Sequence, residues 1–379
     1  MNGMHQRFPS RGSENRQRMI RAWIILLGII LAVVGVVAGV RYFGGRVNAS
    51  ASQLPCRANQ QVTPFGEYVL YYDGASIHCL TETGAVRWSF QIGSGASFAV
   101  GERSMAAWVG NQLYLVDYAG RTTYKDAMPD TVQFARVGKQ YAAVVVGADT
   151  QPTLMVKDLL GTQVDEEKEA FSGMMLLDVG FYGDQGQYMW TTVLDVYGTA
   201  ANTILNTFEV GRMNTGESSL GEAITYRILY ENGKLRVIST RQMRTFTYQG
   251  IENTSETMLV YGWRLLDYEV PRNGSALMLF APTSQTNSSY AISEMRLLSG
   301  ATDRRYTLPS TCAGGTVYRQ TVYAFSSQYI YRAKAGDQRF TATDMPIQGK
   351  EVTDFLGRLD NGKVLLACGD EVYVVTLPT

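Results

Sequence analysis

Histidine is the residue that most narrows the catalytic chemistry open to this sequence. The chain has only two, His5 in a basic N-terminal tail and His78 within a short apolar run. A Ser-His-Asp or Cys-His site in the main part of the chain would have to use His78. In an extended strand, alternation places Ile77 and Cys79 on one face and His78 on the other. We therefore interpret His78 as an ordinary strand residue.

Paired carboxylates are the second chemistry that the residue types could support. Neighbours such as Glu166 and Glu167 could act as the acid and base of a glycosidase, which needs two carboxyl groups at a set separation. Because the chain holds 34 acidic residues, such pairs arise by chance, and we interpret this one as part of a solvated loop. The sequence has no zinc-ligand spacing, phosphate-binding loop or calcium-binding loop. We predict no catalytic residue, no metal and no cofactor.

The four cysteines are Cys56, Cys79, Cys312 and Cys368, which allow three pairings. Cys79 and Cys368 occupy apolar strand positions, where thiols behave as small buried hydrophobes. An oxidising compartment would permit disulfides. The sequence leaves open whether any of them forms.

A charge-free apolar segment sets the topology of the chain. Ala22 to Val40 contains no charged residue and lies between Arg21 and Arg41. As a helix it would be about 28 Å long, close to the thickness of a bilayer's hydrocarbon core. Residues 1–21 carry five arginines and one glutamate, so the positive-inside rule keeps this tail in the cytoplasm. We predict a single-pass cell-membrane protein with a disordered tail 1–21, a transmembrane helix 22–40 and an extracytoplasmic C-terminal domain.

Residues 41–61 are expected to form a polar linker that includes a candidate closing strand. Ala49-Ser50-Ala51 has the small-x-small form of a signal-peptide cleavage site. Cleavage after Ala51 therefore stays an alternative to a retained anchor, and both outcomes export the rest of the chain. Without its tail the chain is mildly acidic, so we expect no nucleic-acid partner.

From residue 62 onward, short apolar runs alternate with Gly, Asp and Asn. Glu67 to Tyr72 is followed by Asp73-Gly74 and then by Ile77 to Leu80, the pattern of a β-hairpin. Asn232-Gly233 and Asn361-Gly362 separate further runs in the same way. The best amphipathic helix pattern, 165–170, covers only a turn or two. We predict an all-β domain over 62–379.

A motif recurs along this domain: two apolar residues separated by one position, then a Gly, then an aromatic residue four positions later. Two copies lie 36 residues apart, and they are Ile77, Cys79, Leu80, Gly84, Trp88 and Leu113, Leu115, Val116, Gly120, Tyr124. Further copies comprise Leu154, Val156, Gly161 and Tyr329, Tyr331, Gly336, Phe340. We assign the turn glycines of the degenerate copies to Gly216, Gly250 and Gly300. A period near 40 with four short strands is typical of a β-propeller blade.

The spacing of the motif predicts the number of blades. Gly84 and Gly336 are separated by six intervals of about 42 residues, which makes seven repeats. A C-terminal hairpin at 364–377 begins an eighth that lacks its last strand or two. A strand from 53–63 could complete that blade and remove the open sheet edges. We favour eight blades, with seven as the alternative.

The hairpin, the Gly turn and the closing aromatic resemble the repeat of PQQ-like and WD40-like propellers, as in Asp73-Gly74, Gly84 and Trp88. Together with the membrane anchor, the chain is similar to a family of membrane-anchored propeller proteins in the envelope of clostridia-like bacteria. This resemblance implies a fold and leaves the function open.

The favoured interpretation is a non-catalytic, membrane-tethered propeller that acts as a binding or scaffold module for an unknown envelope protein or polymer. Rigid propellers display loops around a central channel, and such loops commonly bind partners. The alternatives are an enzyme acting on envelope glycan or a small molecule, and a sensor of an external ligand. The tail 1–21 is too short to hold a folded signalling domain, which weighs against the sensor.

Overall fold

The computed structural model describes residues 48–271, 274–283 and 291–379. The predicted tail 1–21, the predicted transmembrane helix 22–40 and the first part of the linker lie outside the described residues. Within the described residues, no helix has the length and apolar character needed to cross a bilayer. Residues 49–377 form one compact unit.

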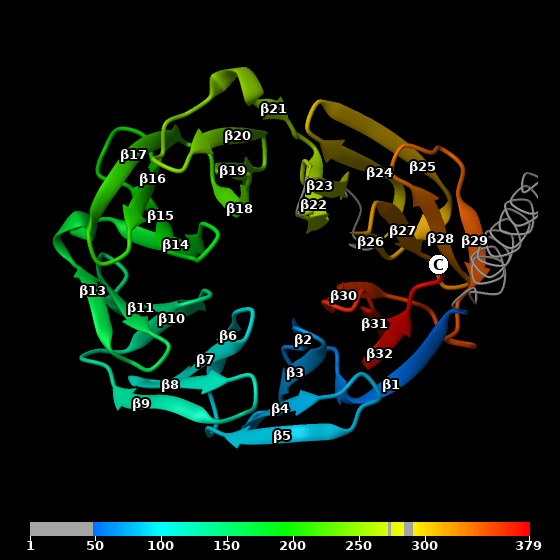
Figure 1. Ribbon diagram of the computed structural model, residues 1–379, viewed down its shortest axis with the longest axis horizontal. Helices are drawn as coiled ribbons and strands as arrows, with labels where there is room; N and C mark the ends of the chain where they lie inside the picture. Colours follow the sequence, from blue (N-terminus) through cyan, green and yellow to red (C-terminus); the bar gives the residue numbers. More distant parts are fainter. Residues whose placement is uncertain (1–47, 272–273, 284–290) are drawn as a thin grey trace, which may run out of the picture. The chain divides into compact units, whose positions relative to one another are not determined.

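This unit is a ring of eight four-stranded antiparallel sheets (Figure 1). The all-β fold and the eight-bladed propeller are therefore confirmed, and the seven-bladed alternative is wrong. In each blade the first strand lies on the inner side of the ring and the fourth on its outer side (Figure 1).

The first four blades follow one another along the chain. Blade I comprises β2 (Thr63–Phe65), β3 (Tyr68–Tyr72), β4 (Ser76–Leu80) and β5 (Val86–Gln91). Blade II comprises β6 (Ser97–Val100), β7 (Ser104–Val109), β8 (Gln112–Asp117) and β9 (Thr122–Ala127). Blade III comprises β10 (Val132–Val137), β11 (Tyr141–Ala148), β12 (Gln151–Asp158) and β13 (Gln163–Glu167), followed by the short 3-10 helix η1 (Glu169–Phe171). Blade IV comprises β14 (Met175–Tyr182), β15 (Tyr188–Asp195), β16 (Asn202–Glu209) and β17 (Met213–Gly221).

The other four blades complete the ring. Blade V comprises β18 (Thr225–Glu231), β19 (Lys234–Ser239), β20 (Gln242–Thr247), the 3-10 helix η2 (Thr254–Glu256) and β21 (Met258–Leu259). Blade VI comprises β22 (Trp263–Glu269), β23 (Leu277–Pro282), β24 (Ile292–Ser299) and β25 (Thr302–Cys312). Blade VII comprises β26 (Gly314–Tyr318), β27 (Thr321–Phe325), β28 (Tyr329–Lys334) and β29 (Thr341–Asp344). Blade VIII comprises β30 (Asp354–Arg358), β31 (Val364–Cys368), β32 (Glu371–Thr376) and β1 (Ser50–Arg57).

Blade VIII is closed by the N-terminal strand, as predicted. β1 pairs antiparallel with β32, with Ser50 opposite Thr376 and Gln53 opposite Tyr373 (Figure 1). The strand begins at Ser50, three residues before the range predicted for it. Leu54 and Cys56 are buried with residues of β3 and β31, so the same strand also contributes to the packing between blades VIII and I.

Contacts between successive blades explain the repeated Gly and aromatic residues. The ring of Trp88 on β5 lies over Gly120, and the ring of Tyr124 on β9 lies over Gly161. Each aromatic side chain thus packs on the turn glycine of the next blade, where a side chain could not fit. Both glycines also have positive φ, +84° and +92°, which L-residues rarely adopt.

One predicted turn glycine is wrong. Gly250 and Gly300 lie in the turns before the fourth strands of blades V and VI, but Gly216 lies within β17. The turn of blade IV holds Gly211 instead, with φ of +75°. In the pairing of the third and fourth strands, Gly216 holds the position that Trp88 and Tyr124 hold in blades I and II. Because Gly216 has no side chain, the backbone carbonyl of Gln249 can approach it from blade V.

The strand order gives the ring two distinct faces. Because every blade has four antiparallel strands, the turn after the second strand and the link to the next blade lie on the same face. We call this the link face. The turns after the first and third strands lie on the opposite face, which we call the turn face.

Candidate binding surface

His78 is less isolated than the sequence suggests. Its Nε2 lies 2.8 Å from Asp73 Oδ2, and its Nδ1 lies 2.8 Å from Ser89 Oγ, so a histidine joins a serine and an aspartate. The ring also stacks on Tyr71 at 4.8 Å between centroids. Sequence reasoning missed both partners because the β3–β4 hairpin turns Asp73 back toward His78, and because the pairing of β4 with β5 places Ser89 opposite it.

This arrangement is better suited to holding blade I together than to catalysis. Ser89 lies in mid-strand on an exposed sheet surface, and it lines none of the described cavities. The hydrogen bond with His78, followed by bonds from the backbone of Ser76 and Ala75, lowers the pKa of Asp73 to about 2. Asp73 therefore fixes the hairpin turn and the histidine at once.

Glu166 and Glu167 lie on a strand rather than in the predicted solvated loop. They belong to β13, and with Asp165 they line a cavity of about 180 Å³ between blades III and IV. Adjacent strand residues point to opposite faces, so the two glutamates do not form a facing pair. Glu167 accepts a hydrogen bond from the backbone of Ala170, and Glu166 accepts one from Gln163.

All four cysteines are free and buried. Each belongs to a different cluster of the core, with Cys56 between blades VIII and I and Cys79 between blades I and II. Burial raises the pKa of the Cys79 and Cys312 thiols to about 12 and that of Cys56 to about 11. The cysteines thus act as small apolar core residues.

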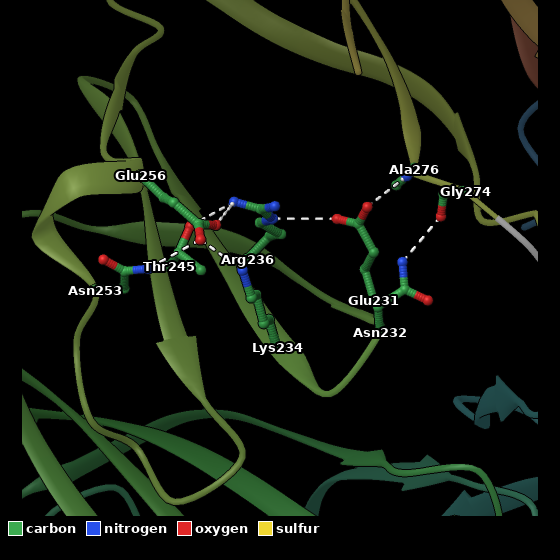
Figure 2. A network of polar contacts seen from close by, with 9 residues as sticks. All are labelled: Glu231, Asn232, Lys234, Arg236, Thr245, Asn253, Glu256, Gly274 and Ala276. Atoms are coloured by element: carbon green, nitrogen blue, oxygen red, sulfur yellow. Dashed lines mark hydrogen bonds and ion pairs between the residues drawn. The ribbon is translucent and has the colours of Figure 1, made fainter. Parts of the chain in front are cut away.

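Blade V departs from the other blades, since its fourth strand, β21, has two residues. A polar network stabilises it: Arg236 on β19 lies between Glu231 and Glu256, at 3.1 and 2.9 Å (Figure 2). Lys234 pairs with the same Glu256. The second oxygen of Glu231 accepts a hydrogen bond from the backbone of Ala276 in blade VI, at 2.6 Å. These charged side chains therefore fix η2 and the seam between two blades.

The link face of this blade carries exposed apolar side chains. Tyr226, at the start of β18, is 41% exposed, and its hydroxyl accepts a hydrogen bond from the Leu265 backbone in blade VI. Leu259 and Tyr261, which follow η2, are 71% and 72% exposed. Ile224 lies on the link before β18 and is also exposed. On neighbouring blade IV, the loop after β15 presents Tyr197 on the same face.

Two exposed arginines lie among these residues. Arg227 is on β18, and Arg241 is in the turn between β19 and β20. The Arg241 carbonyl accepts a hydrogen bond from Val260, which places the turn beside Leu259 and Tyr261. We define the blade V patch as the exposed side chains on the link-face end of this blade, namely Ile224, Tyr226, Arg227, Arg241, Leu259 and Tyr261. From β18 to β21 it spans three strand spacings, about 14 Å.

The composition of the blade V patch is typical of binding surfaces. Protein interfaces are enriched in Tyr and Arg and depleted in Lys, Glu and Asp, and Tyr and Arg dominate their energetic hot spots. Clustered exposed apolar residues also mark interaction sites more often than single ones do. Sequence reasoning missed the patch because its members lie on three separate segments.

Known structures share the fold of this chain. Among those similar to it are BamB from Moraxella catarrhalis, with a TM-score of 0.51 at 9% identity, and Sqt1 from Saccharomyces cerevisiae, with 0.54 at 8%. The first match covers 88% of this chain and 97% of that one, and the second covers 87% and 100%. The chain is a β-propeller. At these identities the likeness shows the fold alone.

No family model matches the sequence, and no curated protein matches it with significant similarity. The predicted resemblance to a clostridial envelope family stays a prediction.

Proposed function

We propose that this protein is a non-catalytic binding module that engages an envelope protein through the blade V patch. The observation that carries the proposal is the concentration of exposed Tyr, Leu, Ile and Arg side chains at one end of one blade. The Arg236 network connects η2 to β19 within blade V, so the patch is already assembled in the unbound protein (Figure 2). Tyr197 is a second exposed tyrosine on the link face, on the neighbouring blade IV.

Photo-cross-linking tests this surface directly. A photoreactive phenylalanine analogue is placed at Tyr261 or at Tyr197 in the full-length protein in its own cells. The control is Tyr248, which is 40% exposed but lies in the turn after β20, on the turn face. We expect a discrete protein adduct from both link-face positions and none from Tyr248. Equal adducts from all three positions, or none from Tyr261 and Tyr197, would overturn the proposal.

The proposal includes tethering by residues 22–40 with the propeller outside the cytoplasm. Its support is the apolar sequence of this segment and the arginines before it. Protease added to intact protoplasts should digest the propeller and leave a membrane-protected fragment. Recovery of the intact chain in the soluble cytoplasmic fraction would contradict the tether.

The glycan-acting alternative depends on the cavity beside β13. Asp165 and Glu167 lie two residues apart on one face of this strand, about 7 Å along it. However, Asp165 accepts a hydrogen bond from the Gly211 backbone of blade IV, across the cavity, and Glu167 accepts one from Ala170 of its own blade, so both carboxylates already have hydrogen-bond donors. We expect no hydrolysis of aryl glycosides by the purified protein. Turnover that is lost in D165N or E167Q would favour the enzyme instead.

A further inference from the structure

We propose that the segment bound by the blade V patch is acidic, a stretch of protein chain in which carboxylates flank apolar side chains. This inference rests on the proposed function and identifies the chemistry of its partner. It follows from how the charges of blade V are distributed between its interior and its link face.

The acidic residues of blade V are already paired. Between β18 and β21 the carboxylates are Glu231, Glu252 and Glu256. Glu231 and Glu256 bind Arg236, and Glu252 binds Arg244. Each of these carboxylates therefore already has a cation as its partner within the blade.

The two arginines of the blade V patch lack such partners. Arg227 and Arg241 are exposed, and neither forms an ion pair with any residue that the structure describes. On the link-face end of blade V, Glu222 is the single carboxylate among the described residues. The patch therefore has an excess of positive charge.

The geometry of these side chains fits carboxylates on a protein partner. A guanidinium binds a carboxylate through two parallel hydrogen bonds, and its pairing strengthens when an interface excludes water. Ile224, Leu259 and Tyr261 beside the arginines would bury apolar side chains of the same segment. An anionic polymer of phosphates could pair with the arginines but would leave these apolar residues exposed, so an acidic protein segment is the better fit.

Selection from a phage-displayed library of random 12-residue peptides tests this inference. The full-length protein in nanodiscs is the bait, and the compared variants are R227E/R241E, Y261A and the control R103E/R339E. Arg103 and Arg339 are also exposed without an ion pair among the described residues, but they lie in turns on the turn face. All variants should keep the melting temperature of the parent protein.

We expect the enriched peptides to contain an excess of Asp and Glu. Their binding should weaken about tenfold or more in R227E/R241E, fall in Y261A, weaken with added salt and stay unchanged in R103E/R339E. Two results would overturn this inference without contradicting the proposed function. In the first, the peptides need Tyr261 for binding but contain no excess of Asp and Glu. In the second, they need Tyr261 but bind R227E/R241E as tightly as the parent protein. Competition by polyphosphate as effective as that by polyglutamate would overturn it in favour of a polymer. Peptides that depend on neither Tyr261 nor the arginines would overturn both.

Discussion

Trp88 of blade I and Gly120 of blade II are packed so closely that a Cβ atom on residue 120 would lie 2.5 Å from the indole Cγ. The indole Nε1 also donates a hydrogen bond to the Tyr118 carbonyl, at 3.3 Å. One aromatic side chain thus joins two blades through a turn that only glycine fits. The Gly and the aromatic residue therefore recur in the sequence because each blade packs on the next through this contact.

Replacing Gly120 with alanine should therefore destabilise the propeller. The positive φ costs about 1–2 kcal/mol for an L-residue, and the clash with Trp88 adds about 1–3 kcal/mol. The matched control is Gly336, which holds the same motif position with φ of +110° but has open space around it. We expect G120A to lower the melting temperature clearly more than G336A does. Equal shifts would mean that backbone strain alone matters at this position.

Deleting residues 363–379 should abolish cooperative folding of the whole ring. The deletion removes β31 and β32, whose Val364, Leu366 and Val375 are fully buried and each contribute about 1.5–3 kcal/mol. It also leaves β1 without its partner. Calorimetry of the full chain and the truncation measures this, with removal of residues 378–379 alone as the control. An unchanged unfolding transition in the longer deletion would contradict ring closure by β1.

The four thiols should resist alkylation in the folded protein. Burial raises the pKa of Cys56 to about 11 and that of Cys79 to about 12, so at pH 8 these thiols stay protonated and unreactive. Mass spectrometry after iodoacetamide treatment should find no modification under native conditions and four modified cysteines in denaturant without reductant. A species that reacts at only two cysteines until it is reduced would reveal a disulfide.

Asp73 should stabilise the fold in a pH-dependent way. Its pKa is about 2 in the folded protein, below the value of about 3.9 expected in the unfolded chain. The ionised carboxylate therefore contributes stability above pH 4, and this contribution is lost as the pH falls toward 2. Because the side chain is partly exposed, D73N should cost about 1 kcal/mol at pH 6. Urea unfolding at pH 6, 4 and 3 should show this difference shrinking, whereas a constant difference would contradict the assignment.

Replacing Arg236 with methionine should leave a buried charge without a partner. Glu231 is 4% exposed, so losing its guanidinium partner should cost about 3–5 kcal/mol. The double variant R236M/E231M removes both charges and should recover part of this loss. If R236M were as stable as the parent protein, the network in Figure 2 would not be what holds blade V.

Much of the fold could be predicted from the sequence because each turn has its own local chemistry. The turns at Asp73-Gly74 and Asn232-Gly233 lie at the positions predicted from their residue types, and φ is +101° at Gly74 and +79° at Gly233. The incomplete C-terminal repeat also predicted that an N-terminal strand would close the ring. The turn of blade IV was predicted wrongly because Gly211 and Gly216 differ in backbone conformation and contacts, with a positive φ at Gly211 alone, and neither difference can be read from the sequence.

The candidate site could not be predicted in the same way. Tyr226, Arg241 and Tyr261 belong to three segments that meet only when β18, β20 and β21 align in one sheet. Nothing in their local sequence distinguishes them from tyrosines that are packed between blades, such as the buried Tyr182. Likewise, the hydrogen bonds of His78 with Asp73 and Ser89 depend on the register of β3, β4 and β5, which the sequence alone does not give.

The position of β1 in blade VIII has a consequence for the order of synthesis. β1 is made near the start of the chain, but its partner β32 begins at Glu371, more than 300 residues later. At ribosomal rates the strand waits on the order of tens of seconds before its partner exists. During that time its backbone edge has no partner strand, and Leu54 and Cys56 lack the part of their packing that blade VIII supplies. The unpaired edge of β1 is therefore open to pairing with other strands until the last strand of the ring has been made.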